Sequence, residues 1–141
     1  MKIKNVLAVQ DLSYCVGQWG CYLICLCACI EELTGNDVDV LKTAKYLIDN
    51  NIVDYDWRRP KAYKNSMYVK DADKVLALMG LPDYKISKVK ELPEDFNGLY
   101  IIRHTLEGST HFTLPDYDPM TWNKVSKEGR ISGYYLLVKK A

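Results

Sequence analysis

The sequence predicts an α+β fold, with helices in the first half of the chain and an antiparallel β-sheet in the second. The first observation is the apolar run at residues 21–30 (CYLICLCACI), which suits a helix buried on nearly every face. The second is the alternation of polar and apolar residues at 84–89 (YKISKV), which indicates a strand. The third is the pair of segments 99–105 and 110–114, which flank the turn residues Glu107-Gly108 and predict a β-hairpin.

Three helices are expected before the sheet. The central helix covers residues 20–33, and a second helix, capped by Asn36 or Asp37, runs to about residue 50. Residues 52–69 have no clean period and are expected to be mostly loop. A third helix opens near Asp71 and ends at Gly80, a typical residue just beyond a helix C-terminus.

The remaining segments complete the predicted sheet. Val125 with its neighbours and residues 131–138 (ISGYYLLV) are expected to supply one or two further strands. The chain has 141 residues, of which 48% are apolar and 26% charged, so a disordered or collagen-like chain is excluded. This length is enough for one domain and too short for two ordinary ones, which predicts a single domain over residues 1–141.

Charge and hydropathy exclude two classes of partner. The net charge is only +1, so no strong field attracts nucleic acid or an anionic membrane. Ten apolar residues at 21–30 span about 15 Å as a helix, roughly half a bilayer, so no membrane-spanning segment is expected. Gln10 and Asp11 interrupt the N-terminal apolar stretch too early for a signal peptide. We therefore expect a cytoplasmic protein that binds neither nucleic acid nor membranes.

The five cysteines lie close together between residues 15 and 29. Four of them fall on the predicted central helix, where neighbouring thiols cannot form a disulfide without breaking the helix. Free thiols in a reducing compartment are therefore expected. Cys25, Cys27 and Cys29 are interpreted as core residues, and Cys15 as a surface thiol in a loop.

Cys21 stands out as a candidate nucleophile because it follows Gly20 at the start of the central helix. A helix N-terminus favours the thiolate, and its unpaired N–H groups can hydrogen-bond an oxyanion. The imidazole of His111, on a late strand, could accept the thiol proton, and Asp118 or Asp116 could orient the ring. These residue types together predict nucleophilic catalysis by a thiol.

A second histidine leaves two alternatives open. With a two-residue turn at 107–108, His104 and His111 become directly opposed on the hairpin, so His104 competes as the base. The two imidazoles could also combine with Cys21 and Cys25 in a tetrahedral zinc site. The usual CxxC and HxxxH spacings are absent, however, so we expect neither a metal nor another cofactor.

Four short motifs stand out along the chain: Gln10-Asp11, Gly20-Cys21-Tyr22-Leu23, His111-Phe112 and Asp118-Pro119. Together they resemble the motifs of papain-like cysteine peptidases, nearest to the bacteriocin-leader-processing (double-glycine) peptidases and their phage and bacterial relatives. The resemblance implies a papain-like fold, in which a buried central helix packs on a C-terminal antiparallel sheet.

The same resemblance implies a catalytic set of Cys21, His111 and Asp118, with a glutamine side chain completing the oxyanion hole. Gln10 is the first candidate for that glutamine and Gln18 the second. The implied activity is cleavage of a peptide, an isopeptide or a related amide bond. The alternative is a catalytically inactive papain-like interaction module of phage or bacterial origin, which the irregular Gln–Cys and His–Asp spacings favour.

Overall fold

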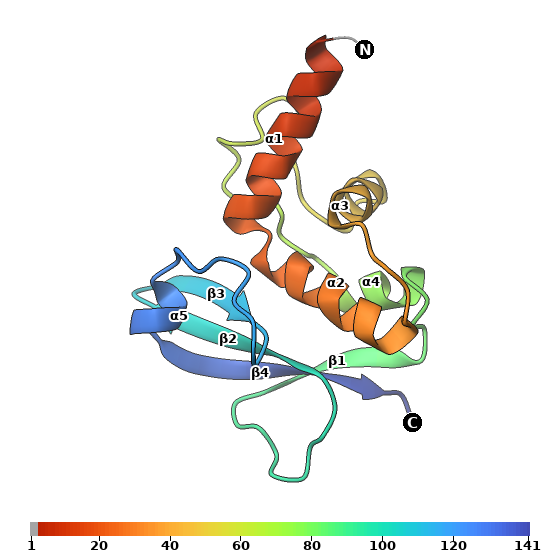
Figure 1. Cartoon of the computed structure of the whole chain (residues 1–141), viewed down its shortest axis with the longest axis vertical. Coiled ribbons are helices and arrows are strands. Elements are labelled where there is room, and N and C mark those ends of the chain that lie inside the picture. The colour runs from red at the N-terminus through yellow and green to blue at the C-terminus, as the bar shows by residue number, and fades with distance from the viewer. Residues whose placement is uncertain (1–2) are drawn as a thin grey trace.

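A computed structural model describes residues 3–141, with side chains from residue 7 onward. Over these residues the chain forms five helices and a four-stranded sheet (Figure 1). In chain order the elements are α1 (Ile3–Trp19), α2 (Cys21–Thr34), α3 (Val40–Asp49), α4 (Ala72–Leu78), β1 (Tyr84–Val89), β2 (Tyr100–Leu106), β3 (Ser109–Thr113), α5 (Val125–Glu128) and β4 (Arg130–Lys139). The predicted α+β class is confirmed.

Helix α2 is the central helix that the apolar run predicts. Its buried side chains include Leu23, Leu26 and Ile30, none more than 1% exposed. The helix ends at Gly35, whose left-handed φ of 74° allows its N–H to bond the carbonyl of Glu31. This is the glycine termination expected at a helix C-terminus.

Gly20 makes the sharp junction between α1 and α2, which are bent by 89°. Its N–H bonds the carbonyl of Val16 at 2.9 Å, so the end of α1 folds directly onto the start of α2. A Cβ atom at Gly20 would lie 2.6 Å from that same carbonyl oxygen. Only glycine fits this turn without a backbone shift, and the turn places Cys21 at the first position of α2.

The strands form one antiparallel sheet in the order β1-β4-β2-β3. The hairpin β2–β3 turns at Glu107 and Gly108, both with positive φ (50° and 82°), as a two-residue type I′ turn requires. This turn sets the register in which His104 pairs directly with His111, as the sequence predicts.

Helix α2 packs on the sheet (Figure 1), and an aromatic cluster lies between them near the first turn of the helix. The ring of Tyr22 lies 4.6 Å from that of Phe112 on β3 and 5.5 Å from that of Tyr135 on β4. These contacts fix the start of α2 against β3. The N-terminal end of the helix and the strand that carries His111 are therefore held together.

Several local predictions need correction. Residues 3–19 form α1, and Cys15 lies on that helix with no exposed surface, so it is not a surface thiol in a loop. Val125 starts the short helix α5 instead of a strand, because the side-chain oxygen of Asn123 accepts from the N–H at this position and so begins a helical turn. The cap of α3 is Asp39, not Asn36 or Asp37.

No single helix in the described part of the chain is long and apolar enough to cross a membrane. Only α1 from Leu7 taken together with α2 meets the length and composition required, and that pair has the 89° bend.

Candidate active site

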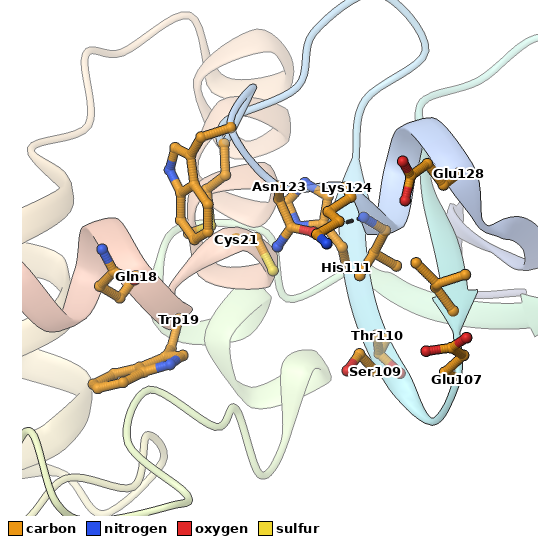
Figure 2. Close-up of a pocket in the computed structure, with 14 residues that line it drawn as sticks. Gln18, Trp19, Cys21, Glu107, Ser109, Thr110, His111, Asn123, Lys124 and Glu128 are labelled. Carbon is orange, nitrogen blue, oxygen red and sulfur yellow. Dashed lines mark hydrogen bonds between the residues drawn. The ribbon is translucent and has the colours of Figure 1, made fainter.

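A pocket of about 820 Å³ opens between the start of α2, the hairpin β2–β3 and the segment that leads into α5 (Figure 2). Cys21 and His111, which are 90 residues apart in the sequence, both line it. In Figure 2 the sulfur of Cys21 points from the start of α2 toward β3, the strand that carries His111. The fold therefore brings the predicted nucleophile and the predicted base to one pocket.

Cys21 is the first residue of α2, where the backbone N–H groups have no hydrogen-bond partner within the helix. The first hydrogen bond within α2 runs from the N–H of Ile24 to the carbonyl of Gly20, so the earlier N–H groups have no helical partner. The backbone N–H groups of Phe112, Tyr22 and Cys21 itself contact the thiol. The pKa of this thiol is nevertheless raised, because the effect of burial exceeds the opposite effect of these three amides.

The position of Cys21 at a helix N-terminus predicts a stabilised thiolate, but the sequence does not reveal the burial that raises the pKa of this thiol. The helix amides do favour the thiolate of Cys21, but its side chain is only 9% exposed. The resting form at neutral pH is therefore the thiol, and a nearby base is needed to remove its proton.

His111 is oriented by Asp118. The imidazole is fully buried, and its Nε2 lies 2.7 Å from Oδ1 of Asp118. An ionised carboxylate can only accept, so Nε2 carries the hydrogen and Nδ1 keeps its lone pair. Nδ1 has no hydrogen-bond partner among the residues that the structure describes. It is the ring atom left to accept a proton.

Asp118 is held by three donors. Its Oδ1 accepts from His111 Nε2 and from the Met120 N–H at 2.8 Å, and its Oδ2 accepts from Ser126 Oγ at 2.6 Å. Burial alone would raise the pKa of this carboxyl, but these bonds, that from Ser126 foremost, outweigh it and hold the pKa below its usual range. Asp118 is thus ionised at neutral pH.

A tight turn brings Asp118 back to the histidine, as proposed from the sequence. The backbone groups of Leu114 and Tyr117 pair antiparallel, with an N–O distance of 2.8 Å for the shorter bond. The alternative acid, Asp116, lies at the tip of this turn, is exposed, and lines a different pocket. The structure therefore joins Asp118, and not Asp116, to His111.

The second histidine has another partner. His104 Nε2 lies 2.8 Å from Thr113 Oγ1, and its side chain does not line the Cys21 pocket. Burial lowers the pKa of His104, and a charge on the adjacent His111 would lower it further. Of the two histidines, only His111 shares a pocket with Cys21.

The two candidate glutamines are separated by the geometry of α1. Gln10 is exposed and lies outside the pocket, whereas Gln18 lines it (Figure 2). Eight residues of helix place them about 12 Å apart along the axis. The structure thus places Gln18, the second candidate, in the lining of the pocket that Cys21 also lines, and leaves Gln10 outside that pocket.

Ser126 is a site residue that the sequence analysis missed. It lies on α5, in a segment predicted as a strand, and its hydroxyl bonds Asp118. The signal that could have revealed the helix is Asn123, whose side-chain oxygen accepts from the Val125 N–H at 2.8 Å at the entry to α5. Such local bonds make asparagine a frequent residue at helix starts.

The zinc alternative requires His104 and His111 to share a ligand set with Cys21 and Cys25. Over residues 3–141 no group of three or more histidine, cysteine or acidic side chains is arranged to hold a metal ion. The Nε2 atoms of the two imidazoles bond Thr113 and Asp118 respectively.

Comparisons with protein-family models, with curated proteins and with solved structures found no match for this chain. The chemistry of the pocket residues themselves therefore indicates what the site can do.

Proposed function

We propose that this chain is a papain-like thiol hydrolase that cleaves an amide bond in a peptide, an isopeptide or a related substrate. One observation carries the proposal. Asp118 binds Nε2 of His111, which leaves Nδ1 without a partner on a residue that lines the same pocket as Cys21. A thiol, an imidazole and an orienting carboxylate in one pocket form the arrangement that nucleophilic acyl transfer requires.

The first half of the reaction forms a thioester. His111 Nδ1 takes the proton from Cys21 as the sulfur attacks the substrate carbonyl carbon, and the carbonyl oxygen becomes an oxyanion. When the tetrahedral intermediate collapses, the C–N bond breaks and the leaving amine takes the proton from Nδ1. Between these two proton transfers His111 is an imidazolium, and the carboxylate of Asp118 stabilises its positive charge.

The second half releases the acid. Water attacks the thioester and gives a proton to Nδ1, the C–S bond breaks, and the proton returns to the sulfur of Cys21. In both halves the N–H of Cys21 and the side-chain amide of Gln18 are the donors that we assign to the oxyanion. Because burial raises the pKa of the Cys21 thiol, the sulfur needs a base to remove its proton, and we assign this role to His111.

The layout of the chain supports the papain-like assignment. Cys21 opens a buried helix, and His111 and Asp118 follow on and beside the antiparallel sheet. This order agrees with the resemblance to the bacterial and phage-borne members of the family. The five unpaired thiols further support a reducing compartment such as the cytoplasm.

One observation favours a second candidate, a papain-like interaction module without activity. His111 has no exposed surface and Cys21 is only 9% exposed, so little of either side chain is open to a substrate. An inert scaffold would tolerate such burial equally well.

Cleavage by matched cysteine variants separates these two candidates. The full chain is incubated with a mixed library of N-acetylated peptides, and cleavage is followed by mass spectrometry. We expect turnover by the wild type and by Cys27→Ala, a variant of a buried thiol on the same helix, and none by Cys21→Ala. Absence of any Cys21-dependent cleavage would favour the inactive module.

A further inference from the structure

Cys21 lies at the junction of two pockets. The pocket described above shares Trp19, Cys21 and Thr110 with a second pocket of about 600 Å³. The second pocket extends between residues 64–69, the end of β1 and the middle of β4. The two pockets therefore meet at Cys21, and we take them to hold the parts of the substrate on either side of the reacting bond.

The position of His111 shows which pocket holds the leaving group and which holds the acyl group. This step rests on the proposed hydrolase function. The imidazole that removes the thiol proton must later deliver it to the leaving amine. His111 lines the first pocket and not the second. The first is therefore the leaving-group pocket, and the second is the acyl pocket, which holds the part that becomes the thioester.

The acyl pocket is positively charged. Lys64 and Lys88 line it, and it contains no aspartate or glutamate. Both lysines are exposed, and neither forms an ion pair with a carboxylate in the part of the chain that the structure describes. The ammonium of Lys88 lies 4.9 Å from the centre of the Tyr135 ring, which keeps the charge at the pocket wall.

The leaving-group pocket has the opposite balance. Two carboxylates, Glu107 and Glu128, line it beside one ammonium, Lys124. Figure 2 shows both carboxylates on the far side of His111 from Trp19. The two pockets thus differ in charge: lysines alone supply the charge of the acyl pocket, and carboxylates outnumber ammonium groups in the leaving-group pocket.

We propose that the substrate is a peptide with an acidic side chain, aspartate or glutamate, on the acyl side of the cleaved bond. Unpaired ammonium groups at the wall of the acyl pocket attract a carboxylate and repel an ammonium, so the pocket selects by charge. The rings of Tyr22, Phe112 and Tyr135 in the same pocket contact the apolar part of that segment.

Tripeptide aldehydes test this assignment because they fill only the acyl side. The thiol of Cys21 adds across the aldehyde, the S–C bond forms and the proton moves to the oxygen, so the peptide is held next to the sulfur. N-acetylated tripeptide aldehydes with Glu, Gln or Lys at each position in turn are compared by how well they protect Cys21 from iodoacetamide. At one position we expect the Glu aldehyde to protect Cys21 about fivefold to tenfold better than the Lys aldehyde does. High salt should make this difference in protection smaller.

Charge-reversal variants then link the preference to the two lysines. In the Lys64→Glu/Lys88→Glu double variant, the Lys aldehyde should protect Cys21 better than the Glu aldehyde does. In Lys88→Gln, the Glu aldehyde should keep its advantage over the Lys aldehyde, but the difference in protection should be smaller. Lys85→Glu, an exposed position on the same strand β1 that lines neither pocket, should leave the order unchanged.

Two results would overturn the proposal, and they can be told apart. Equal protection by Glu, Gln and Lys aldehydes at every position would reject the acidic specificity and leave the hydrolase function standing. Protection by none of the aldehydes would reject Cys21 as a nucleophile, and the assignment of the acyl pocket would fall with it.

Discussion

Cys21 and Cys25 are one helical turn apart on α2, yet their thiols have different surroundings. Cys25 has no exposed surface, and burial is the main cause of its raised pKa. Deeper in the helix, burial raises the pKa of Cys27 and of Cys29 to about 12. At Cys21 burial is opposed by three backbone N–H groups, and two pockets reach the side chain.

This difference follows from position in the helix. Beyond the first turn every amide N–H of a helix is bonded to a carbonyl, so a thiol there has no free amide to bond. In the first turn the amides are free to bond the sulfur or an oxyanion. The same residue type is therefore a core side chain at Cys25, Cys27 and Cys29, and a candidate nucleophile at Cys21.

The largest expected effect concerns the oxyanion donor at the first turn. Gln18→Ala removes the side-chain amide that we assign to the oxyanion and should lower kcat by about 10²-fold to 10³-fold. Gln10→Ala, on the exposed part of α1, is the matched control and should leave kcat unchanged. Steady-state kinetics on a cleaved library peptide measures both, and equal kcat values for the two variants would refute the role of Gln18.

An effect of intermediate size is expected on stability. Cys25→Ser places a hydroxyl in an apolar site without exposed surface and should cost about 1–3 kcal/mol of unfolding free energy. Cys21→Ser should cost less, because backbone N–H groups are available to the new hydroxyl. Urea denaturation under reducing conditions compares the two; a larger loss for Cys21→Ser would contradict the distinction between the two environments.

The smallest expected effect is the pH dependence of Asp118. Its pKa is lower in the folded state than the usual value of about 3.9, so its carboxylate stabilises the fold fully above that value. This contribution disappears as the pH falls through the lowered folded pKa. Asp118→Asn should therefore be less stable than the wild type at pH 7, by about 1 kcal/mol.

Urea denaturation between pH 2 and pH 7 tests this linkage. The unfolding free energies of the wild type and of Asp118→Asn should converge at the acid end of the series. A difference that does not change with pH would show that the Asp118 carboxylate is not the group responsible. Asp116→Asn, on the exposed tip of the preceding turn, is the control and should follow the wild type.

Local sequence signals predicted much of the site. The Glu107-Gly108 turn fixes the pairing of His104 with His111, and the turn at residues 114–117 returns Asp118 to the imidazole. These features depend on neighbours in the chain, so their sequence signals are strong. The apolar run predicts α2 equally directly. A helix that is buried on all faces is apolar along its whole length, so the run alone identifies it.

What the sequence could not provide depends on contacts between distant segments. Helix α1 was missed because it also exposes the large apolar residues Leu7, Val9 and Tyr14. With apolar residues on both faces, the sequence does not show the helical spacing of the buried ones. Without α1, the choice between Gln10 and Gln18 had no geometric basis. The raised pKa of Cys21 was likewise out of reach, because it depends on how closely β3 covers the start of α2.

Thiol labelling tests most directly the claim that His111 is the base that removes the proton of the Cys21 thiol. The chain is treated briefly with iodoacetamide between pH 6 and pH 10, and each cysteine is quantified by mass spectrometry in the wild type, His111→Gln and His104→Gln, with circular dichroism to verify folding. We predict that Cys21 reacts first in the wild type and in His104→Gln, and that His111→Gln slows Cys21 alone at pH 6–8. Uniform labelling of the five thiols, or an unchanged Cys21 rate in folded His111→Gln, would contradict the account.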